Sequence, residues 1–494
     1  MKHLRGRHFT ILACFIAVLP WATPVAAATV TVTSTADGRG ICPGPTCGAP
    51  QSCPGIRCTL RLAIEAAASG DTINFALPAN STINLNDGTL SIDNKNLTII
   101  GPGANLLTVQ RSDAPGTPAF RVFYTHISSV AISGLTIANG YATANLYGGG
   151  GFFVNGGTLT ITNSIISGNK TSNTSFGGGG IFGTGSLLIR NSTIAGNSTE
   201  SSGGGIWAAS SLSLTNSTVA GNAAYNGNSG GGIYIGFGAT AVITNSTISG
   251  NSANGGGGGI ATDQAYNLTI TNSTVTDNSA NPGGGIQLYA GSSNPNVATA
   301  RNTIIAKNKA PVGPDIIGPL ISGGFILIGD TNNSTITGRS TDILNVDAKL
   351  DSLRNNGGPT LTHALLPGSK AIDTGHSSGS NTDQRGFTRR AGNSAVPLTG
   401  GDGSDIGAYE YGAEIVQSDC LFDWAEMNYS SGLAPAGAKS AAFAPYYFRY
   451  YPQTNAYVGT SIADYHVYYL GPASGHSIFD LGTLLDWISI AGCQ

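Results

Sequence analysis

The sequence has few charged residues. Asp, Glu, Lys and Arg make up 10% of the 494 residues, and the formal net charge is −3. Three basic residues, Lys2, Arg5 and Arg7, lie in an N-terminal leader, and without them the balance is −6. Proteins that bind nucleic acid carry clustered basic residues that neutralise phosphates. The charge balance does not suit such a partner, and we expect no nucleic acid.

Long apolar runs are missing as well. The N-terminal run, residues 9–19, is shorter than the roughly 20 residues that a membrane helix needs, and no later segment approaches that length. The run follows the basic residues and precedes a small-residue site at residues 25–28, which is typical of a cleaved export signal. We expect a signal peptide at residues 1–28, a secreted or cell-surface protein, and no membrane-spanning segment in the mature chain. The alternative is an uncleaved anchor.

The middle of the chain has few residues that could catalyse a reaction. No His falls between His126 and His363. Glycoside hydrolysis needs two facing carboxylates, and elimination needs a base together with a metal or an Arg. We predict no catalytic residue, no metal site and no cofactor. The charged residues between positions 140 and 300 are Lys170, Arg190, Glu200, Asp263 and Asp277.

Charge gathers closer to the C-terminus. We interpret this group as a solvated, ion-paired cap, and the alternative is a catalytic or calcium site. The segment at residues 400–405 resembles the start of a calcium-binding nonapeptide only once, and Gly407 stands where a large apolar residue belongs. The residues are Asp373, Asp383, Arg385, Arg389, Arg390, Asp402, Asp405 and Glu410.

Cysteines are few but even in number once Cys14 leaves with the signal. An even count in an exported chain predicts disulfides. A metal site is the alternative for the first four, although their spacing differs from the paired two-residue spacing of most zinc sites. The six cysteines are Cys42, Cys47, Cys53, Cys58, Cys420 and Cys493.

What the chain has in abundance is glycine, 72 residues, and an internal repeat with a period of about 28 residues. Units such as LTITNSIISGN from Leu159 and LSLTNSTVAGN from Leu212 share apolar residues four and two positions before an Asn, and another three positions after it. The change from even to odd spacing marks a corner at Asn, which tolerates a left-handed backbone. The first Asn of each unit is at positions 163, 191, 216, 245, 272 and 302, and a second Asn column is at positions 169, 197, 222, 251, 278 and 308.

A third apolar column follows each Gly run, so one unit holds three short strands and three corners. Such strands must pair with their counterparts one turn along, which gives parallel sheets. The sequence therefore predicts an all-β, right-handed parallel β-helix of about ten turns at residues 72–345. Residues 29–71, with the Cys cluster and a short helix, form the N-terminal cap. Residues 346–412 form the C-terminal cap, and residues 413–494 a small Tyr-rich α+β domain stapled by its two cysteines.

Two segments carry a resemblance to a known family. CTLRLAI, from Cys58, resembles the CSLREAI motif of exported bacterial β-helix proteins, with Thr59 for Ser and Leu62 for Glu. The run NNGGPTLTHALLPGSKAIDTG, with TDQRGF and DIGAYEY after it, is similar to the end of the choice-of-anchor Q domain. The resemblance implies a right-handed parallel β-helix on an exported or surface protein. It implies no single catalytic activity.

One column of aromatic residues is a candidate binding site. Phe153, Phe182, Trp207 and Tyr234 occupy the same position in four successive turns. If the preceding residue points inward, these side chains point outward and form an open stripe for sugar rings. The alternative is that loops cover the stripe and it serves only in packing.

These observations favour a non-catalytic, adhesin-like or scaffold protein that binds glycans or cell-surface components. The alternative is a polysaccharide lyase or glycoside hydrolase with its site in loops or at the C-terminal cap. The sequence does not indicate an oligomeric state.

Overall fold

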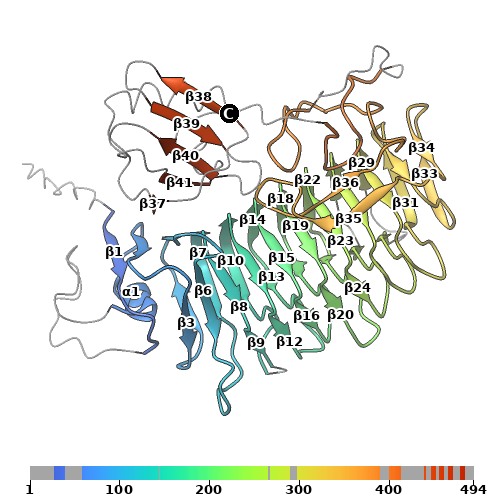
Figure 1. Cartoon of the computed structure of the whole chain (residues 1–494). Helices are drawn as coiled ribbons and strands as arrows, with labels where there is room; N and C mark the ends of the chain where they lie inside the picture. The colour runs from blue at the N-terminus through green and yellow to red at the C-terminus, as the bar shows by residue number, and fades with distance from the viewer. Residues whose placement is uncertain are drawn as a thin grey trace, which may run out of the picture.

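The computed structural model describes residues 27–38, 58–143, 145–264, 267–289, 297–389 and 400–412, together with the backbone of five strands between residues 439 and 483. Within these ranges the chain forms a coil of parallel strands, with one short helix, α1 (Leu60–Ala66), near its N-terminal end (Figure 1). The all-β parallel coil predicted from the repeat is confirmed.

Three parallel sheets line the coil. One sheet has 11 strands, and the coil has about eight regular turns against the roughly ten predicted. Strands in all three sheets pair in register with the equivalent strand one turn along, so every turn repeats the previous one. The 11 strands are β3 (Ser81–Leu85), β6 (Leu107–Arg111), β8 (Thr136–Ala138), β11 (Ile165–Ser167), β15 (Thr193–Ala195), β19 (Thr218–Ala220), β23 (Thr247–Ser249), β27 (Thr274–Thr276), β30 (Ile304–Ala306), β32 (Leu327–Ile328) and β34 (Ile343–Leu344).

The largest sheet has 18 strands, two for each regular turn, and its first strand comes from ahead of the predicted start at residue 72. That strand, β1, pairs in parallel with β2 and so adds to the coil. The strands are β1 (Thr29–Val32), β2 (Thr72–Phe75), β4 (Leu90–Asp93), β5 (Leu97–Ile100), β7 (Phe123–Ser133), β10 (Phe152–Thr162), β13 (Ile181–Gly183), β14 (Ser186–Arg190), β17 (Ile206–Ala208), β18 (Ser211–Thr215), β21 (Ile233–Ile235), β22 (Thr240–Thr244), β25 (Ile260–Thr262), β26 (Asn267–Thr271), β28 (Ile286–Gln287), β29 (Val297–Arg301), β31 (Ile316–Ser322) and β33 (Ser334–Thr337).

The third sheet is short and has five two-residue strands in the middle turns. It closes the coil beside the Gly runs. Its strands are β9 (Tyr141–Ala142), β12 (Lys170–Thr171), β16 (Ser198–Thr199), β20 (Ala223–Ala224) and β24 (Ser252–Ala253).

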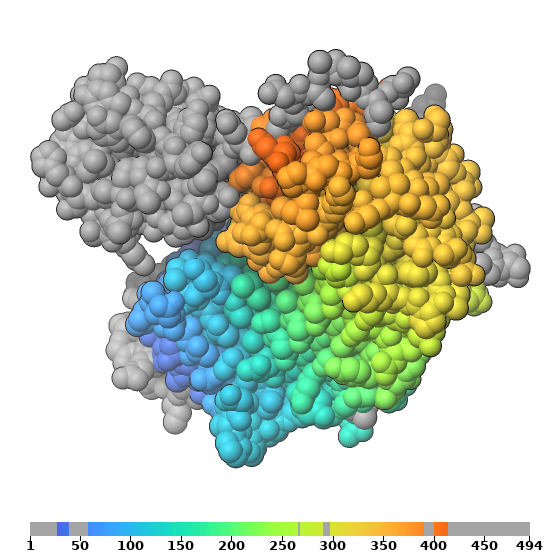
Figure 2. All heavy atoms as spheres, turned by 45° about the vertical axis from the view of Figure 1, so that its right-hand side comes forward, coloured from blue at the N-terminus to red at the C-terminus, as the bar shows by residue number. Residues whose placement is uncertain are grey.

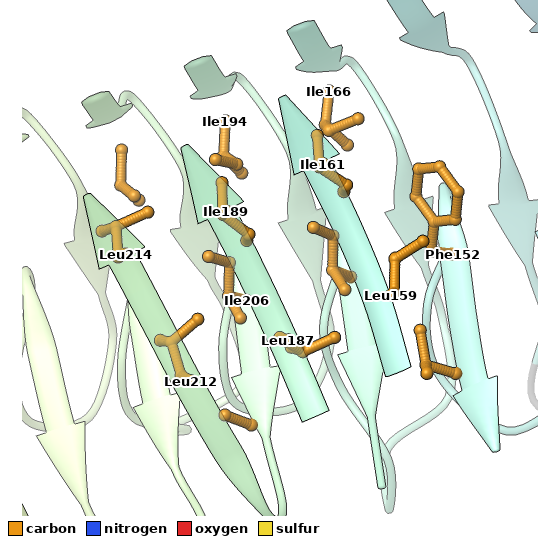
Figure 3. Close-up of a cluster of buried hydrophobic side chains, with 14 of the residues drawn as sticks. Phe152, Leu159, Ile161, Ile166, Leu187, Ile189, Ile194, Ile206, Leu212 and Leu214 are labelled. Atoms are coloured by element: carbon orange, nitrogen blue, oxygen red, sulfur yellow. The ribbon is translucent and has the colours of Figure 1, made fainter. Parts of the chain in front are cut away.

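The core of the coil is a set of stacked aliphatic columns. Leu159, Ile161 and Ile166 are fully buried, and the equivalent residues of the next turn lie directly beside them (Figure 3). Burying one such side chain contributes roughly 1.5–3 kcal/mol, and each turn adds several. The apolar columns predicted from the repeat are therefore the core.

The first Asn of each unit makes the corner that the sequence predicts. All six residues have a left-handed backbone, with φ between 46° and 52°, which Asn adopts at lower cost than other residues with a side chain. The corner turns the chain from the largest sheet into the 11-stranded sheet.

The second Asn column forms a buried hydrogen-bond ladder, hereafter the asparagine ladder: Asn169, Asn197, Asn222, Asn251, Asn278 and Asn308. Each Nδ2 donates to the Oδ1 of the next Asn at 2.9–3.0 Å, and each Oδ1 also accepts from the backbone N–H one turn back. The last amide donates to the buried Asp315 carboxylate at 2.8 Å. Burial raises the pKa of Asp315 to about 6, against the opposing effect of Asn308.

The Gly runs leave room for this ladder. A Cβ at Gly232 would lie 2.7 Å from the carbonyl oxygen of Gly259 and 3.0 Å from the amide of Asn251, and equivalent Gly residues recur in the neighbouring turns. A side chain there would push the turns apart or displace the amide. The recurrence of glycine is thus a packing requirement of the Asn column.

The N-terminal end of the coil is covered by α1. Thr59 caps the helix by accepting from the Leu62 N–H, and Arg61 forms a buried ion pair with Asp37 at 2.8 Å. Cys58 is buried just before the helix. The predicted helix in this cap is confirmed, whereas the other five predicted disulfide cysteines lie outside the described residues, so the disulfides stay a prediction.

The segment expected to cover the last turn, described at residues 346–389 and 400–412, folds back along one side of the coil (Figures 1 and 2). It contains the antiparallel pair β35 (Leu350–Arg354) and β36 (Thr362–Leu365). Leu361 O accepts from Thr218 Oγ1, Gln384 Oε1 from Thr247 Oγ1, and Ser377 O from Asn272 Nδ2. Polar side chains at the corners and at the strand starts that follow them face outward and need partners, and the segment supplies them in three successive turns. We call it the clasp.

Near the C-terminus five strands form an antiparallel sheet. The helical part of the predicted α+β domain, and both of its cysteines, lie outside the described residues, as does most of the predicted signal peptide. The strands are β37 (Lys439–Ser440), β38 (Tyr447–Tyr451), β39 (Ala456–Thr460), β40 (His466–Leu470) and β41 (Phe479–Thr483).

Breaking the asparagine ladder should unfold the coil at lower denaturant. Asn222→Ala removes the acceptor for two Asn197 donors and the donor to Ile194 O, which leaves several buried polar groups without a partner. We expect a loss of about 3 kcal/mol or more in unfolding free energy, measured by urea denaturation. Asn332→Ala, at an exposed Asn, is the control. An equal stability for both variants would contradict the role of the ladder.

Candidate functional site

The four predicted aromatic residues form a column, and Tyr124 adds a fifth ring at its N-terminal end. Strand pairing aligns Tyr124 with Phe153, then Phe182, Trp207 and Tyr234, one residue from each of five turns. Neighbouring ring centroids are 5.0–5.4 Å apart; Phe153 and Phe182 are stacked, and Trp207 makes edge contacts with Phe182 and Tyr234. Such ring pairs stabilise by about 0.5–1.5 kcal/mol beyond their burial.

The column is not the open stripe that was expected. Phe153 and Phe182 are only 5% and 3% exposed, because the rings of Tyr147 and Phe176 pack over them. The alternative stated from the sequence, that loops cover the stripe, is correct for these two residues. Trp207 and Tyr234 are half-buried. Only the far half of the predicted stripe therefore reaches the surface.

The covering rings form an outer layer that the sequence analysis missed. Tyr147 is 55% exposed, Phe176 is 37% exposed, and their centroids are 4.9 Å apart. Phe176 also lies 6.3 Å from Trp207. The exposed rings thus run on into the half-buried ones, and we call Tyr147, Phe176, Trp207 and Tyr234 together the aromatic shelf.

A sequence signal for the outer layer was present. Tyr147 and Phe176 each stand directly before a Gly run, in successive turns. In the next turn Ser201 precedes Ser202, whose carbonyl lies against Gly177. Because a small Ser replaces an aromatic ring there, Trp207 is less covered than Phe153 and Phe182.

Polar groups lie beside the shelf. Trp207 Nε1–H is buried and finds no acceptor within the described part of the chain. Burial, followed by the nearby Asp263 carboxylate, raises the pKa of Tyr234, which keeps its hydroxyl protonated. At the other end Asn155 Nδ2 contacts Tyr124 Oη at 3.1 Å and His126 Nδ1 at 3.0 Å. Aromatic rings with nearby hydrogen-bonding groups are typical of sugar-binding surfaces.

A buried cation lies at the same end. Arg121 is 6% exposed, its guanidinium carbon is 4.9 Å from the Phe153 ring centroid, and Nη2 donates to Tyr147 O at 2.6 Å. Burial lowers the pKa of Arg121 to about 10. The group remains a cation at neutral pH.

Five of the eight charged residues near the C-terminus are buried in the clasp, Asp373 and Asp402 are half-buried, and Arg390 lies outside the described residues. Arg385 forms an ion pair with Asp383 at 2.7 Å, and Arg389 lies 3.7 Å from Glu410. These four side chains are at most 5% exposed. Their contacts favour the interpretation as an ion-paired structural unit over a catalytic site.

A pair between the coil and the clasp has the residue types of a nucleophile and its base. Ser249 Oγ and His363 Nε2 are 2.8 Å apart, and His363 Nδ1 contacts Asp351 O at 2.6 Å. Both side chains are buried, and burial lowers the pKa of His363. A substrate cannot reach Ser249, so we assign the pair to docking of the clasp.

Among the described residues, no three His, Cys, Asp or Glu side chains gather closely enough to hold a metal ion. No helix in these ranges is long and apolar enough to cross a bilayer.

Comparisons with known proteins bear on the fold. The family described as "Right handed beta helix region" matches residues 150–341, and with the coil it shows a right-handed parallel β-helix protein. No curated protein matches the chain. A solved structure titled "Crystal structure of pectate lyase Pel9A" aligns with 14% identity and a TM-score of 0.45, over 78% of this chain and 97% of that one.

The clasp should make stability depend on pH. Burial, followed by Glu410, raises the pKa of Asp405, so the folded chain keeps a proton that the unfolded chain releases near 3.8. Stability should therefore fall as pH rises above that value, until the raised folded pKa is passed.

Asp405→Asn cannot ionise, so its unfolding free energy should fall less between about pH 5 and about pH 8 than that of the wild type. Urea denaturation across this range measures the slope. Asn also removes one acceptor from the backbone N–H groups of Asp373 and Tyr411, which lowers stability at every pH. The slope of stability against pH is therefore compared, and not its absolute value. Parallel curves for the two proteins would refute the assignment.

Proposed function

We propose that this protein is an exported, non-catalytic β-helix that binds glycans through the aromatic shelf. The observation that carries the proposal is the outer layer of Tyr147 and Phe176, which places large rings in solvent beside the half-buried Trp207 and Tyr234. Exposed aromatic rings are costly in water unless a ligand covers them. Sugar rings carry apolar faces that suit such a surface.

The shape of the coil supports binding of an extended chain. The shelf follows the long axis, since its rings come from successive turns at strand spacing of about 4.8 Å. A polysaccharide lying along that axis would meet one ring after another. The proposed ligand is therefore an oligosaccharide of several units rather than a single sugar.

The carboxylates of the clasp support a non-catalytic role. A glycosidase acid and base must reach the scissile bond, and the carboxylates of Asp383, Asp405 and Glu410 are buried and engaged with backbone N–H groups or Arg. At the far end of the shelf, the Asp263 carboxylate lies near Tyr234. Polysaccharide cleavage remains the competing function that the experiment must test.

The motifs CTLRLAI and DIGAYEY extend the proposal to a family. We assign the chain to exported proteins with a CSLREAI-type start and a choice-of-anchor Q-like end, located at or outside the cell surface. In this chain CTLRLAI supplies the cap helix and its Arg61–Asp37 ion pair. DIGAYEY supplies Asp405 and Glu410 of the clasp. Both motifs therefore have structural roles, in the N-terminal cap and in the clasp, that are separate from the shelf.

Removing shelf rings should weaken glycan binding. Tyr147→Ala and Trp207→Ala each delete a stacking surface, and we expect affinity for a bound oligosaccharide to fall about fivefold to tenfold or more, since one stacked ring contributes about 1 kcal/mol or more. Calorimetry with a panel of acidic and neutral oligosaccharides measures the change. Because Tyr147 also contacts Phe153 and Phe176, its removal should lower the unfolding free energy by about 1 kcal/mol, and the variant should stay folded at the temperature of the assay.

Tyr411→Ala is the matched control. Tyr411 is 41% exposed and lies at the end of the clasp, outside the ring stack. Loss of affinity in this variant, or unchanged affinity in both shelf variants, would reject the shelf as the binding site. Sustained release of new sugar ends by the repurified wild type would show that the protein cleaves polysaccharides and would overturn the non-catalytic proposal.

A further inference from the structure

Arg121 has no acidic partner within the residues that the structure describes. Its only hydrogen bond is from Nη2 to Tyr147 O, and its buried Nε has no acceptor. Burial lowers its pKa, and no carboxylate within the described ranges opposes this effect. Arg121 is therefore a desolvated cation without a counter-ion.

Such an arrangement is costly by itself. Removing a guanidinium from water costs several kcal/mol unless an anion or a full set of acceptors replaces the water. The contact with the Phe153 ring at 4.9 Å, and the longer one with Tyr124 at 6.0 Å, return about 2 kcal/mol at most. The other Arg residues with comparable burial, Arg61, Arg385 and Arg389, all lie beside carboxylates. Arg121 alone among these four lacks one.

The position of Arg121 joins it to the shelf. Its hydrogen-bond acceptor is the backbone of Tyr147, the first ring of the shelf, and its cation–π partner Phe153 lies directly beneath that ring. His126 and Asn155 lie beside Tyr124 on the adjoining surface. A sugar stacked on Tyr147 would thus carry its substituents next to a cation and neutral hydrogen-bonding groups.

We propose that Arg121 binds the carboxylate of an acidic sugar, a uronic acid, held on the aromatic shelf. This rests on the proposed glycan-binding function and adds the chemical class of the ligand. The carboxylate supplies the missing counter-ion, and Nη1, which makes no hydrogen bond in the described structure, supplies the donor. Arg suits this role because its planar group binds carboxylates directionally.

The experiment compares one uronic-acid oligosaccharide with its methyl ester. The two ligands share sugar rings and linkages, and only the acid carries charge. With the full mature chain, calorimetry should show that the acid binds about tenfold or more tightly than the ester, because a hydrogen bond to a charged group contributes 1.5 kcal/mol or more. Arg121→Gln should abolish this preference while the affinity for the ester is retained.

Three comparisons complete the test. Arg190→Gln removes the same charge from an exposed site at the end of β14, a strand that carries no shelf ring, and should keep the preference. Arg121→Lys keeps the charge but not the planar group, and should keep only part of the preference. Retained binding of the ester shows that Arg121→Gln is folded.

The failures are distinguishable. If neither ligand binds the wild type, the glycan-binding proposal itself is wrong. If both bind equally, or if the preference survives in Arg121→Gln, glycan binding stands and the role of Arg121 is refuted. Binding of a sulfated neutral oligosaccharide through Arg121, without binding of the uronide, would overturn the assignment to a carboxylate.

Discussion

The buried asparagine ladder is the interaction on which the rest of this structure depends. An amide inside an apolar coil is tolerable only if every donor and acceptor is satisfied, and here each Asn bonds to the next Asn and to the backbone of the preceding turn. Because these hydrogen bonds form only at one relative position, they fix the register of each turn against the next. It also explains the glycines, since the amides of Asn222 and Asn251 occupy the space that a Cβ at Gly205 or Gly232 would need. The spacing of the aromatic rings follows from the same register.

The clasp meets a different need of the same coil. Regular corners leave Thr218, Thr247 and Asn272 with polar groups pointing away from the core, and neighbouring turns cannot satisfy them all. The clasp brings carbonyl and amide groups to them and buries its own ion pairs in doing so. The acidic and basic residues of the clasp, which resemble a reactive centre in the sequence, therefore hold the clasp against the coil. The surface that stays open lies elsewhere, on the Gly-run side of the coil.

The repetitive features of the fold could be predicted from the sequence, and the unique features could not. Asn163 and its five equivalents marked the corners because the same backbone requirement recurs every turn. The alignment of Phe153, Phe182, Trp207 and Tyr234 followed from strand register alone. Their exposure did not, because it depends on Tyr147 and Phe176, which come from loops of irregular length. Likewise, nothing periodic indicates that Gln384 meets Thr247, or that Arg121 lacks a carboxylate, since each is a single contact between distant segments.

The asparagine ladder also has a direction, and this bears on how such a coil can change length. Between side chains, every amide donates to the next Asn toward the C-terminal end, and only the last acceptor, Asp315, differs from the rest. A duplicated turn inserted between Asn222 and Asn251 would find a donor on one side and an acceptor on the other, with no new chemistry required. Loss of one internal turn would likewise leave the ladder complete. Recombination between repeats can thus lengthen or shorten the coil by whole turns, whereas the two ends, and the clasp that spans a fixed set of turns, constrain where such events are tolerated.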